Sequence, residues 1–167
     1  KKIPPGEIYE QLKTGQIDGA EFVGPTADMI LNLHTAAKYY YTPGWWEPGC
    51  NVSLYINREK FMTLPPVYQQ ALEIAASYLG NYQLAEYDAV NANSVKILLN
   101  EGIEIREFPN DILEAAYEAA QEYYAELSEQ NEDFRIIFTN YSQFLMDQAL
   151  WSGVAEERYR GFMRSLV

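Results

Sequence analysis

One long stretch of helix-forming residues most restricts what this chain can fold into. Between Pro65-Pro66 and Gly102 hardly any residue disfavours a helix. An unbroken helix of this length extends about 50 Å at 1.5 Å per residue, which exceeds the width of a small domain. Gly80-Asn81 is the place where a kink is expected. The fold must therefore accommodate an element longer than one small lobe.

Shorter predicted elements lie on both sides of this helix. The other predicted helices cover residues 4–15, 25–39 and 110–167. The predicted strands cover residues 16–24, 39–42, 51–57 and 103–108. A break in the last helical region is expected near Asn131. Short strands that alternate with helices, followed by an all-helical C-terminal third, indicate the α/β class.

The charge balance argues against one class of partner. The chain carries 24 acidic and 12 basic residues, a net charge of -12. Binding to a nucleic-acid backbone requires clustered Lys and Arg, so no nucleic-acid partner is expected. No run of about 18 apolar residues is present, so no transmembrane helix is expected. The sequence shows neither an initiator Met nor a signal peptide, and it reads as a mature product, a truncated form or an internal fragment.

Cysteine and histidine offer little catalytic chemistry. Cys50 is the single cysteine, which excludes an intrachain disulfide and suits the cytosol and the periplasm equally. His34 is the single histidine, and it lies within a helical pattern where an ordinary helix-face role is the simpler interpretation. Neither a metal–thiolate site nor a Cys-His catalytic pair is therefore predicted.

Two acidic residues stand out by their surroundings. Glu47 follows two tryptophans in YYYTPGWWEPG, residues 39–49, and Glu21 precedes the turn FVGP. Both lie at ends of predicted strands, and ligands of open α/β sheets bind beyond strand ends. The alternative is that Glu47 caps a turn, that Glu21 merely ends a strand, and that the aromatic rings pack in the core. The residue types alone leave both interpretations open.

Several motifs resemble one family of transport proteins. The segments are GEIY (6–9), IDGAEFVGP (17–25), YYYTPGWWEPG (39–49), INREKFMTLPP (56–66) and, more weakly, GIEIREFPNDIL (102–113). They are similar to motifs of the solute-binding proteins of tripartite ATP-independent periplasmic (TRAP) transporters. The first three segments, which belong to two motif blocks of the family, are specific, and together the segments extend over nearly the whole chain. The resemblance is to the branch that binds 2-oxo and 2-hydroxy acids beside a cation.

The resemblance implies a set of site residues. Glu21 and Glu47 would supply carboxylate oxygens to a bridging Na⁺ or Ca²⁺, and Phe22 would supply its backbone carbonyl. Trp45 and Trp46 would join these residues around a small carboxylate ligand. Phe22 stands where the family usually has Trp, and Pro48 stands where it has Gly and would stiffen the turn after Glu47.

The resemblance also implies a larger two-lobe periplasmic binding protein, of which this chain is the C-terminal half. The missing N-terminal half would carry the arginine that pairs with the ligand carboxylate. Residues 1–19 and 60–132 would form the C-terminal lobe, and residues 20–59 would cross to the other lobe and carry the site. Strands within that crossing segment would then lack neighbours. Residues 133–167 would form C-terminal helices with a dimer contact.

The chemistry explains why an acid would lie among tryptophans. Two carboxylates within about 5 Å repel each other, and without a counter-charge one would take up a proton. A bridging cation removes that cost, and it also binds the carboxylate and the 2-oxo or 2-hydroxy oxygen of the ligand. Aromatic side chains would exclude water and strengthen each polar contact.

Three functions are compared. The favoured one is a periplasmic receptor, not an enzyme, that delivers a small carboxylate to the membrane subunits of a TRAP permease. A two-carboxylate enzyme such as a glycosidase would need its carboxyl groups about 5–9.5 Å apart with room for a sugar. A helical interaction module is the third, and it is compatible with the first. The apolar residues from about Asp133 onward are expected to pack on the Pro66–Glu101 helix of the same or a neighbouring subunit, and they predict a homodimer in which they contact the other subunit.

Overall fold

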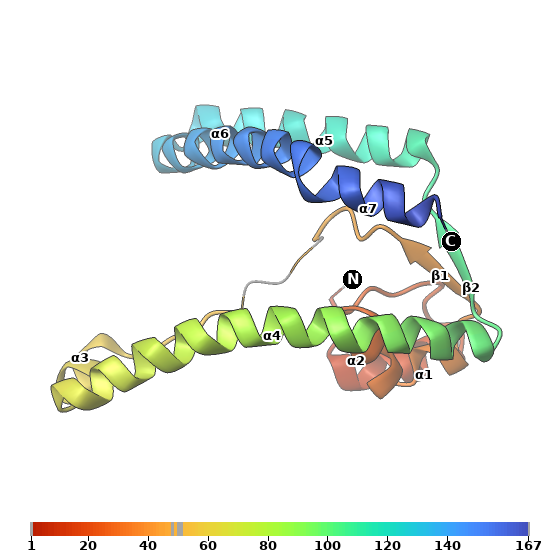
Figure 1. Ribbon diagram of the computed structural model, residues 1–167, viewed down its shortest axis with the longest axis horizontal. Helices are drawn as coiled ribbons and strands as arrows, with labels where there is room; N and C mark the ends of the chain where they lie inside the picture. The colour runs from red at the N-terminus through yellow and green to blue at the C-terminus, as the bar shows by residue number, and fades with distance from the viewer. Residues whose placement is uncertain (1, 48, 50–51, 167) are drawn as a thin grey trace. The chain divides into compact units, whose positions relative to one another are not determined.

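The computed structural model describes residues 2–47, 49 and 52–166, and the chain forms two compact units, Lys1–Phe108 and Pro109–Val167. The first unit contains, in chain order, α1 (Pro5–Lys13), α2 (Pro25–Ile30), the 3-10 helix η1 (Leu33–Thr35), β1 (Tyr39–Thr42), α3 (Arg58–Met62), α4 (Pro66–Asn100) and β2 (Glu104–Glu107) (Figure 1). The second unit contains α5 (Asn110–Gln130), α6 (Glu132–Val154) and α7 (Glu156–Arg164).

Helix α4 confirms the prediction of one long helix. It runs unbroken for 35 residues, through Gly80 and Asn81. Pro66 begins it, and Gly102 follows it with a φ of 84°, a left-handed conformation that glycine adopts without steric cost. Only Ser94 and Leu98 in its C-terminal part are buried, where α4 packs against α2. The long helix thus anchors a small unit at one end.

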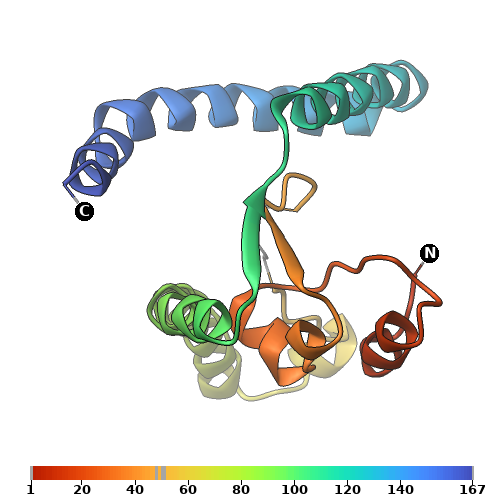
Figure 2. The same ribbon diagram turned by 90° about the vertical axis from the view of Figure 1, so that its right-hand side faces the viewer.

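The strands β1 and β2 pair in parallel, with Tyr39 opposite Glu104 and Thr42 opposite Glu107 (Figure 2). Parallel pairing needs a crossover, and the connection that contains α4 provides it. The expectation that strands of the crossing segment lack neighbours is therefore wrong for β1, because β2 of the same chain pairs with it.

Two of the predicted strands do not form. Residues 16–24 and 52–57 carry no strand, and among the described residues only β1 and β2 form a sheet. Residue 51, the first of the second predicted strand, lies outside the described residues. In a strand, Val52 and Tyr55 would lie on opposite faces, yet both are exposed, Val52 to 69% and Tyr55 to 90%. Alternation predicts a strand only where a neighbour completes the hydrogen bonds and covers one face, and here neither face is covered.

The predicted helix over residues 25–39 is also shorter than expected. Helix α2 ends at Ile30, and Asn32 adopts a left-handed φ of 57° before η1 begins. Asparagine tolerates this conformation better than most residues. The turn places Leu33 in the core, 9% exposed. Packing of Leu33 outweighs continuation of the helical pattern.

The core of the first unit is small. Its buried apolar side chains are Ile8, Leu33, Leu98 and Ile103. Leu98 is the most deeply enclosed, at 1% exposure. Beside this core the side chain of His34 is 10% exposed, and its Nε2 lies 3.2 Å from a Glu101 carboxylate oxygen. His34 thus joins η1 to the C-terminal end of α4, which agrees with a structural role.

An exposed ionic cluster lies along the small sheet. The Glu104 carboxylate accepts from Lys38 Nζ and from Arg106 Nη2, each at 2.7 Å. The guanidinium of Arg106 lies 3.8 Å from the centre of the Tyr39 ring. The hydrogen bond from Lys38, and then that from Arg106, lowers the pKa of Glu104 below its ordinary value. The cluster therefore favours the ionised form of Glu104.

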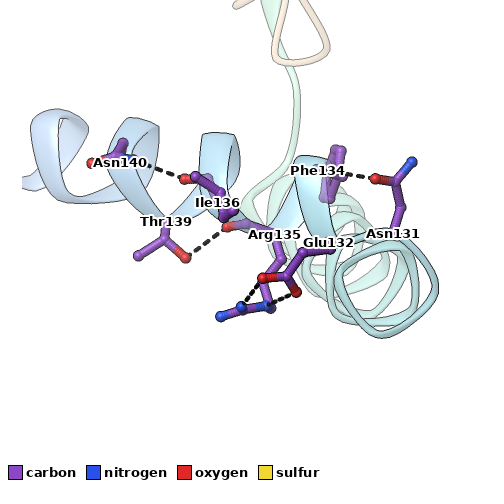
Figure 3. A network of polar contacts seen from close by, with 7 residues as sticks. All are labelled: Asn131, Glu132, Phe134, Arg135, Ile136, Thr139 and Asn140. Carbon is purple, nitrogen blue, oxygen red and sulfur yellow. Dashed lines mark hydrogen bonds and ion pairs between the residues drawn. The ribbon is translucent and has the colours of Figure 1, made fainter.

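The second unit is entirely helical, and the predicted break near Asn131 is confirmed. The Asn131 side chain accepts a hydrogen bond from the Phe134 backbone N–H at 3.0 Å, which caps the start of α6 (Figure 3). The rings of Phe134 and Phe138 stack 5.6 Å apart, and Tyr124 of α5 lies 4.7 Å from Phe138. A further break at Ala155, before α7, was not predicted.

Helices α5 to α7 bury none of their described residues. Several large apolar side chains of α6 are more than half exposed: Ile137, Tyr141, Phe144, Leu145, Leu150 and Trp151. Within the described part of the chain, no helix has the combination of length and apolarity needed to cross a membrane. An exposed apolar surface of this size is uncommon on a soluble monomer, and such surfaces usually mark a contact with another molecule.

Candidate ligand- and cation-binding site

A cavity of about 800 Å³ lies within the first unit. The loop between α1 and α2, residues 17–25, forms one side of it. Strand β1 and the segment that follows it form another. Leu98 of α4 and Ile105 of β2 are among the apolar side chains that complete its lining. The cavity therefore extends along β1, from the residues before the strand to the segment after its carboxyl end.

Most predicted site residues line this cavity. Glu21 and Phe22 contribute from the loop before α2, and Trp46 and Glu47 contribute from the segment after β1. Trp45 is not among the lining residues, and its ring instead packs edge-on against Trp46 at 5.0 Å. The fold thus places along one cavity two acidic residues that are 26 positions apart in the sequence. Their sharing of one ion stays a prediction.

The segment that carries Glu47 is positioned by aromatic contacts. Trp46 packs against Phe108 with ring centres 6.0 Å apart, and Tyr41 of β1 lies 5.2 Å from the same ring. Phe108 directly follows β2, so the sheet orients the turn after β1. Pro48 and Cys50 lie outside the described residues, and the stiffening expected from Pro48 stays a prediction.

The expected dry aromatic enclosure is not formed by this chain. Trp45 and Trp46 are 43% and 44% exposed, and both Glu21 and Glu47 are exposed. A dry site needs apolar surface on all sides of the ligand. The described residues of this chain supply only part of such a wall, so water reaches both carboxylates.

Asp28 and Tyr40 also line the cavity, and the sequence did not indicate them as site residues. Asp28 Oδ2 accepts a hydrogen bond from the Tyr40 hydroxyl at 2.6 Å. Burial raises the pKa of Tyr40 above its ordinary value, and the negative charges of Asp28 and Glu21 raise it further. Tyr40 therefore keeps its proton and acts as a donor. The sequence did contain one signal for Asp28: it is an acid in the first turn of α2, and the residue before this helix is a glycine, which has no side chain to cap it.

The oxygen atoms available for a cation are few. Glu21 and Glu47 offer carboxylates, and Phe22 offers a carbonyl. In the described part of the chain, no group of three or more His, Cys, Asp or Glu residues is arranged to hold a metal. Ca²⁺ takes about six to eight oxygen ligands. The side chains described here fit part of such a shell, and the rest must come from a ligand, water or other protein groups.

A cavity beside a parallel sheet, lined by carboxylates and aromatic side chains, is typical of a protein that binds a small solute. Residues 1–131 match the family model of bacterial extracellular solute-binding proteins, family 7 (DctP). Because the match extends over most of the chain, the chain belongs to this family.

A curated relative and two solved structures extend the comparison. A monocarboxylate 2-oxoacid-binding periplasmic protein of Nostoc sp. is 33% identical over 163 residues, which is 98% of this chain and 45% of the relative. A TRAP transporter solute-binding protein of Bordetella bronchiseptica is 37% identical with a TM-score of 0.94, over 99% of this chain and 49% of that protein. A TRAP periplasmic solute-binding protein of Colwellia psychrerythraea is 26% identical with a TM-score of 0.91, over 96% of this chain and 49% of that protein.

These relatives carry ligands. The Bordetella structure is a mixed-occupancy dimer in which one site holds copurified calcium and picolinate, whereas the other is an apo site. The Colwellia structure holds calcium and pyruvate. The present chain spans about half the length of each relative.

The comparisons confirm three expectations from the sequence. The resemblance to TRAP solute-binding proteins is confirmed by the family match and by both structures. The fold is that of TRAP periplasmic binding proteins, and in this chain it is mostly helical with a small parallel sheet. The family consists of transport components without enzymatic activity, so the two-carboxylate enzyme is not supported.

Proposed function

We propose that the protein carrying this chain captures a small 2-oxo or 2-hydroxy carboxylate in the periplasm and delivers it to the membrane subunits of a TRAP-type permease. The observation that carries the proposal is the convergence of Glu21, Phe22 and Glu47 on one cavity. Three relatives support it: one binds pyruvate, which is a 2-oxo acid, one binds picolinate, which is another small carboxylate, and the third is a 2-oxoacid-binding periplasmic protein.

In this proposal a cation bridges the protein and the ligand. Glu21, Glu47 and the Phe22 carbonyl bind the ion, which in turn binds one carboxylate oxygen and the 2-oxo or 2-hydroxy oxygen of the ligand. Two carboxylates and an anionic ligand together carry a charge that a divalent ion offsets better than a monovalent one. The calcium in both related structures supports Ca²⁺ over Na⁺.

The central test replaces one ion ligand by a neutral amide. In the intact protein, Glu47→Gln should weaken pyruvate binding more than tenfold, about 1.4 kcal/mol or more, because an anionic oxygen is lost from the ion. Isothermal titration calorimetry in buffers with Ca²⁺, with Na⁺ and with a chelator measures this. Glu10→Gln is the matched control, since Glu10 is exposed on α1 and outside the cavity lining. If pyruvate binds to Glu47→Gln, and to the unmodified protein in cation-free buffer, as tightly as it binds to the unmodified protein with Ca²⁺, the bridging ion is refuted.

A second proposal concerns assembly. We propose that residues from about 133 onward contact a second copy of the protein, which would cover the exposed apolar side chains of α6. The dimer of the Bordetella relative supports this. Light scattering at micromolar concentrations should give a dimer, and Phe144→Glu together with Trp151→Glu should dissociate it. A monomer in the unmodified protein would exclude the contact.

A further inference from the structure

The Asp28 carboxylate holds the loop that carries two of the predicted ion ligands. Its Oδ1 atom accepts hydrogen bonds from the backbone N–H groups of Val23 and Gly24, at 3.2 Å and 3.3 Å. These are the first two amides after Glu21 and Phe22. Val23 and Gly24 precede α2, so Asp28 in the first turn of the helix reaches back to their N–H groups. Helix α2 and the preceding loop are thereby joined.

One of these hydrogen bonds bears directly on the Phe22 carbonyl. The carbonyl of Phe22 and the N–H of Val23 belong to the same peptide unit, which is planar and trans. In a trans peptide the C=O and N–H groups point in opposite directions. Because the Val23 N–H points at Asp28, the Phe22 carbonyl oxygen points away from Asp28. The orientation of this predicted ion ligand therefore follows from the hydrogen bond that Asp28 accepts.

The other oxygen of Asp28 contacts strand β1. Oδ2 accepts a hydrogen bond from the Tyr40 hydroxyl of β1 at 2.6 Å. Tyr40 remains protonated because burial and the neighbouring carboxylates raise its pKa. Strand β1 leads into the segment that carries Glu47. Asp28 thus links the two segments that supply Glu21 and Glu47.

Helix α2, which carries Asp28, is itself fixed to α4. The Thr26 backbone N–H donates to Asn91 Oδ1 at 3.1 Å, and the hydroxyl groups of Thr26 and Ser94 lie 2.8 Å apart. Ser94 is only 7% exposed. Asp28 therefore lies on a helix that is held against α4, so its hydrogen bonds can hold the preceding loop in one position relative to β1.

We infer that Asp28 is a positioning residue for the cation site, which it serves by orienting the loop of Glu21 and Phe22 and joining that loop to β1. Asp28 is not itself an ion ligand in this assignment, because both of its oxygens are already engaged with donors. The inference rests on the proposed function, since it deepens the account of the same site. Groups that orient the ligands of a metal ion commonly change its affinity by about 10- to 100-fold when they are removed.

The test compares Ca²⁺ affinity in variants of the intact protein, measured by calorimetry with Ca²⁺ alone and then with Ca²⁺ and pyruvate. Asp28→Ala removes all three acceptor contacts and should weaken Ca²⁺ binding by about 10- to 100-fold. Asp28→Asn keeps a carbonyl oxygen for the Val23 and Gly24 amides, and its amide group can donate to the Tyr40 oxygen. It should therefore recover most of the lost affinity although the charge is gone.

Two further variants separate positioning from stability. Tyr40→Phe removes only the link to β1 and should weaken Ca²⁺ binding in the same direction as Asp28→Ala, by a smaller factor. Asn131→Ala is the control: it removes the side-chain oxygen that accepts a hydrogen bond from the Phe134 backbone N–H in the second unit. It should lower the melting temperature without changing Ca²⁺ affinity. All affinities are measured at a temperature at which circular dichroism shows each variant to be folded.

The outcomes distinguish this inference from the proposed function. If the unmodified protein binds no Ca²⁺, or Glu47→Gln binds it equally well, the proposed function fails. If Glu47→Gln loses binding whereas Asp28→Ala retains it, only the inference about Asp28 fails. Equal losses in Asp28→Asn and Asp28→Ala would show that charge and not positioning matters, and would overturn the inference. Should Asp28→Ala not fold, unchanged affinity in Tyr40→Phe overturns it.

Discussion

Replacing Leu98 by alanine should strongly destabilise the protein. Leu98 is 1% exposed, and it lies where α4 meets the core and the cavity lining. The substitution removes three buried carbon atoms, which contribute about 2.4 kcal/mol at ~0.8 kcal/mol each. The space left behind adds a cavity term, because the long helix restricts collapse around it. Together these predict a loss of about 3–5 kcal/mol in the free energy of unfolding.

The neighbouring Leu99 provides the matched control, since the same substitution there changes the same atoms. Leu99 is 53% exposed. Only about half of the transfer free energy is then at stake and no closed cavity forms, so Leu99→Ala should cost about 1 kcal/mol or less. Equilibrium urea unfolding, followed by circular dichroism with the slope m compared between variants, measures both values. If both variants lost the same free energy of unfolding, the conclusion that Leu98 belongs to the core and Leu99 does not would be refuted.

Two smaller effects follow from polar contacts. Asn131→Ala removes the cap of α6 and should cost about 1 kcal/mol, measurable by urea unfolding, whereas no change would mean that water or another group replaces the cap. The hydrogen bonds of Lys38 and Arg106 lower the pKa of Glu104 from its ordinary value of 4.5, so their stabilising effect is present above pH 4.5. It is lost as the pH falls through the lowered pKa of the folded state. The melting temperature of Glu104→Gln should therefore fall less steeply between pH 4.5 and pH 3 than that of the unmodified protein, and parallel curves would contradict this.

The sequence predicted those elements that local chemistry determines. Helix α4 begins at a proline and is followed by a glycine, as expected from the residues that start and end helices. Strand β1 was expected because its tyrosines favour extended backbone and Pro43 follows them. The strand predicted at residues 52–57 does not form, because a strand also needs a neighbour that the local sequence does not reveal.

The candidate site divides in the same way. The sequence motifs singled out Glu21 and Glu47, because an acid beside turn residues or tryptophans is unusual enough to stand out, and the resemblance to TRAP solute-binding proteins added Phe22. They did not identify Asp28 or Tyr40. Asp28 resembles any acid in the first turn of a helix, and Tyr40 resembles its two tyrosine neighbours. Only the fold shows that these two side chains meet at 2.6 Å.

By itself, the sequence predicted the proline that begins α4 and the glycine that follows it, and it singled out Glu21 and Glu47 as candidate site residues. Both depend on residues close together in the chain, through backbone preference and side-chain type. The tertiary structure alone decided that β1 pairs with β2, that Leu33 interrupts the helical pattern to enter the core, and that Asp28 joins the loop of Glu21 to β1. These contacts join residues that are distant in the chain or depend on which face is buried. Their free energy depends on a common packing arrangement that no single segment encodes.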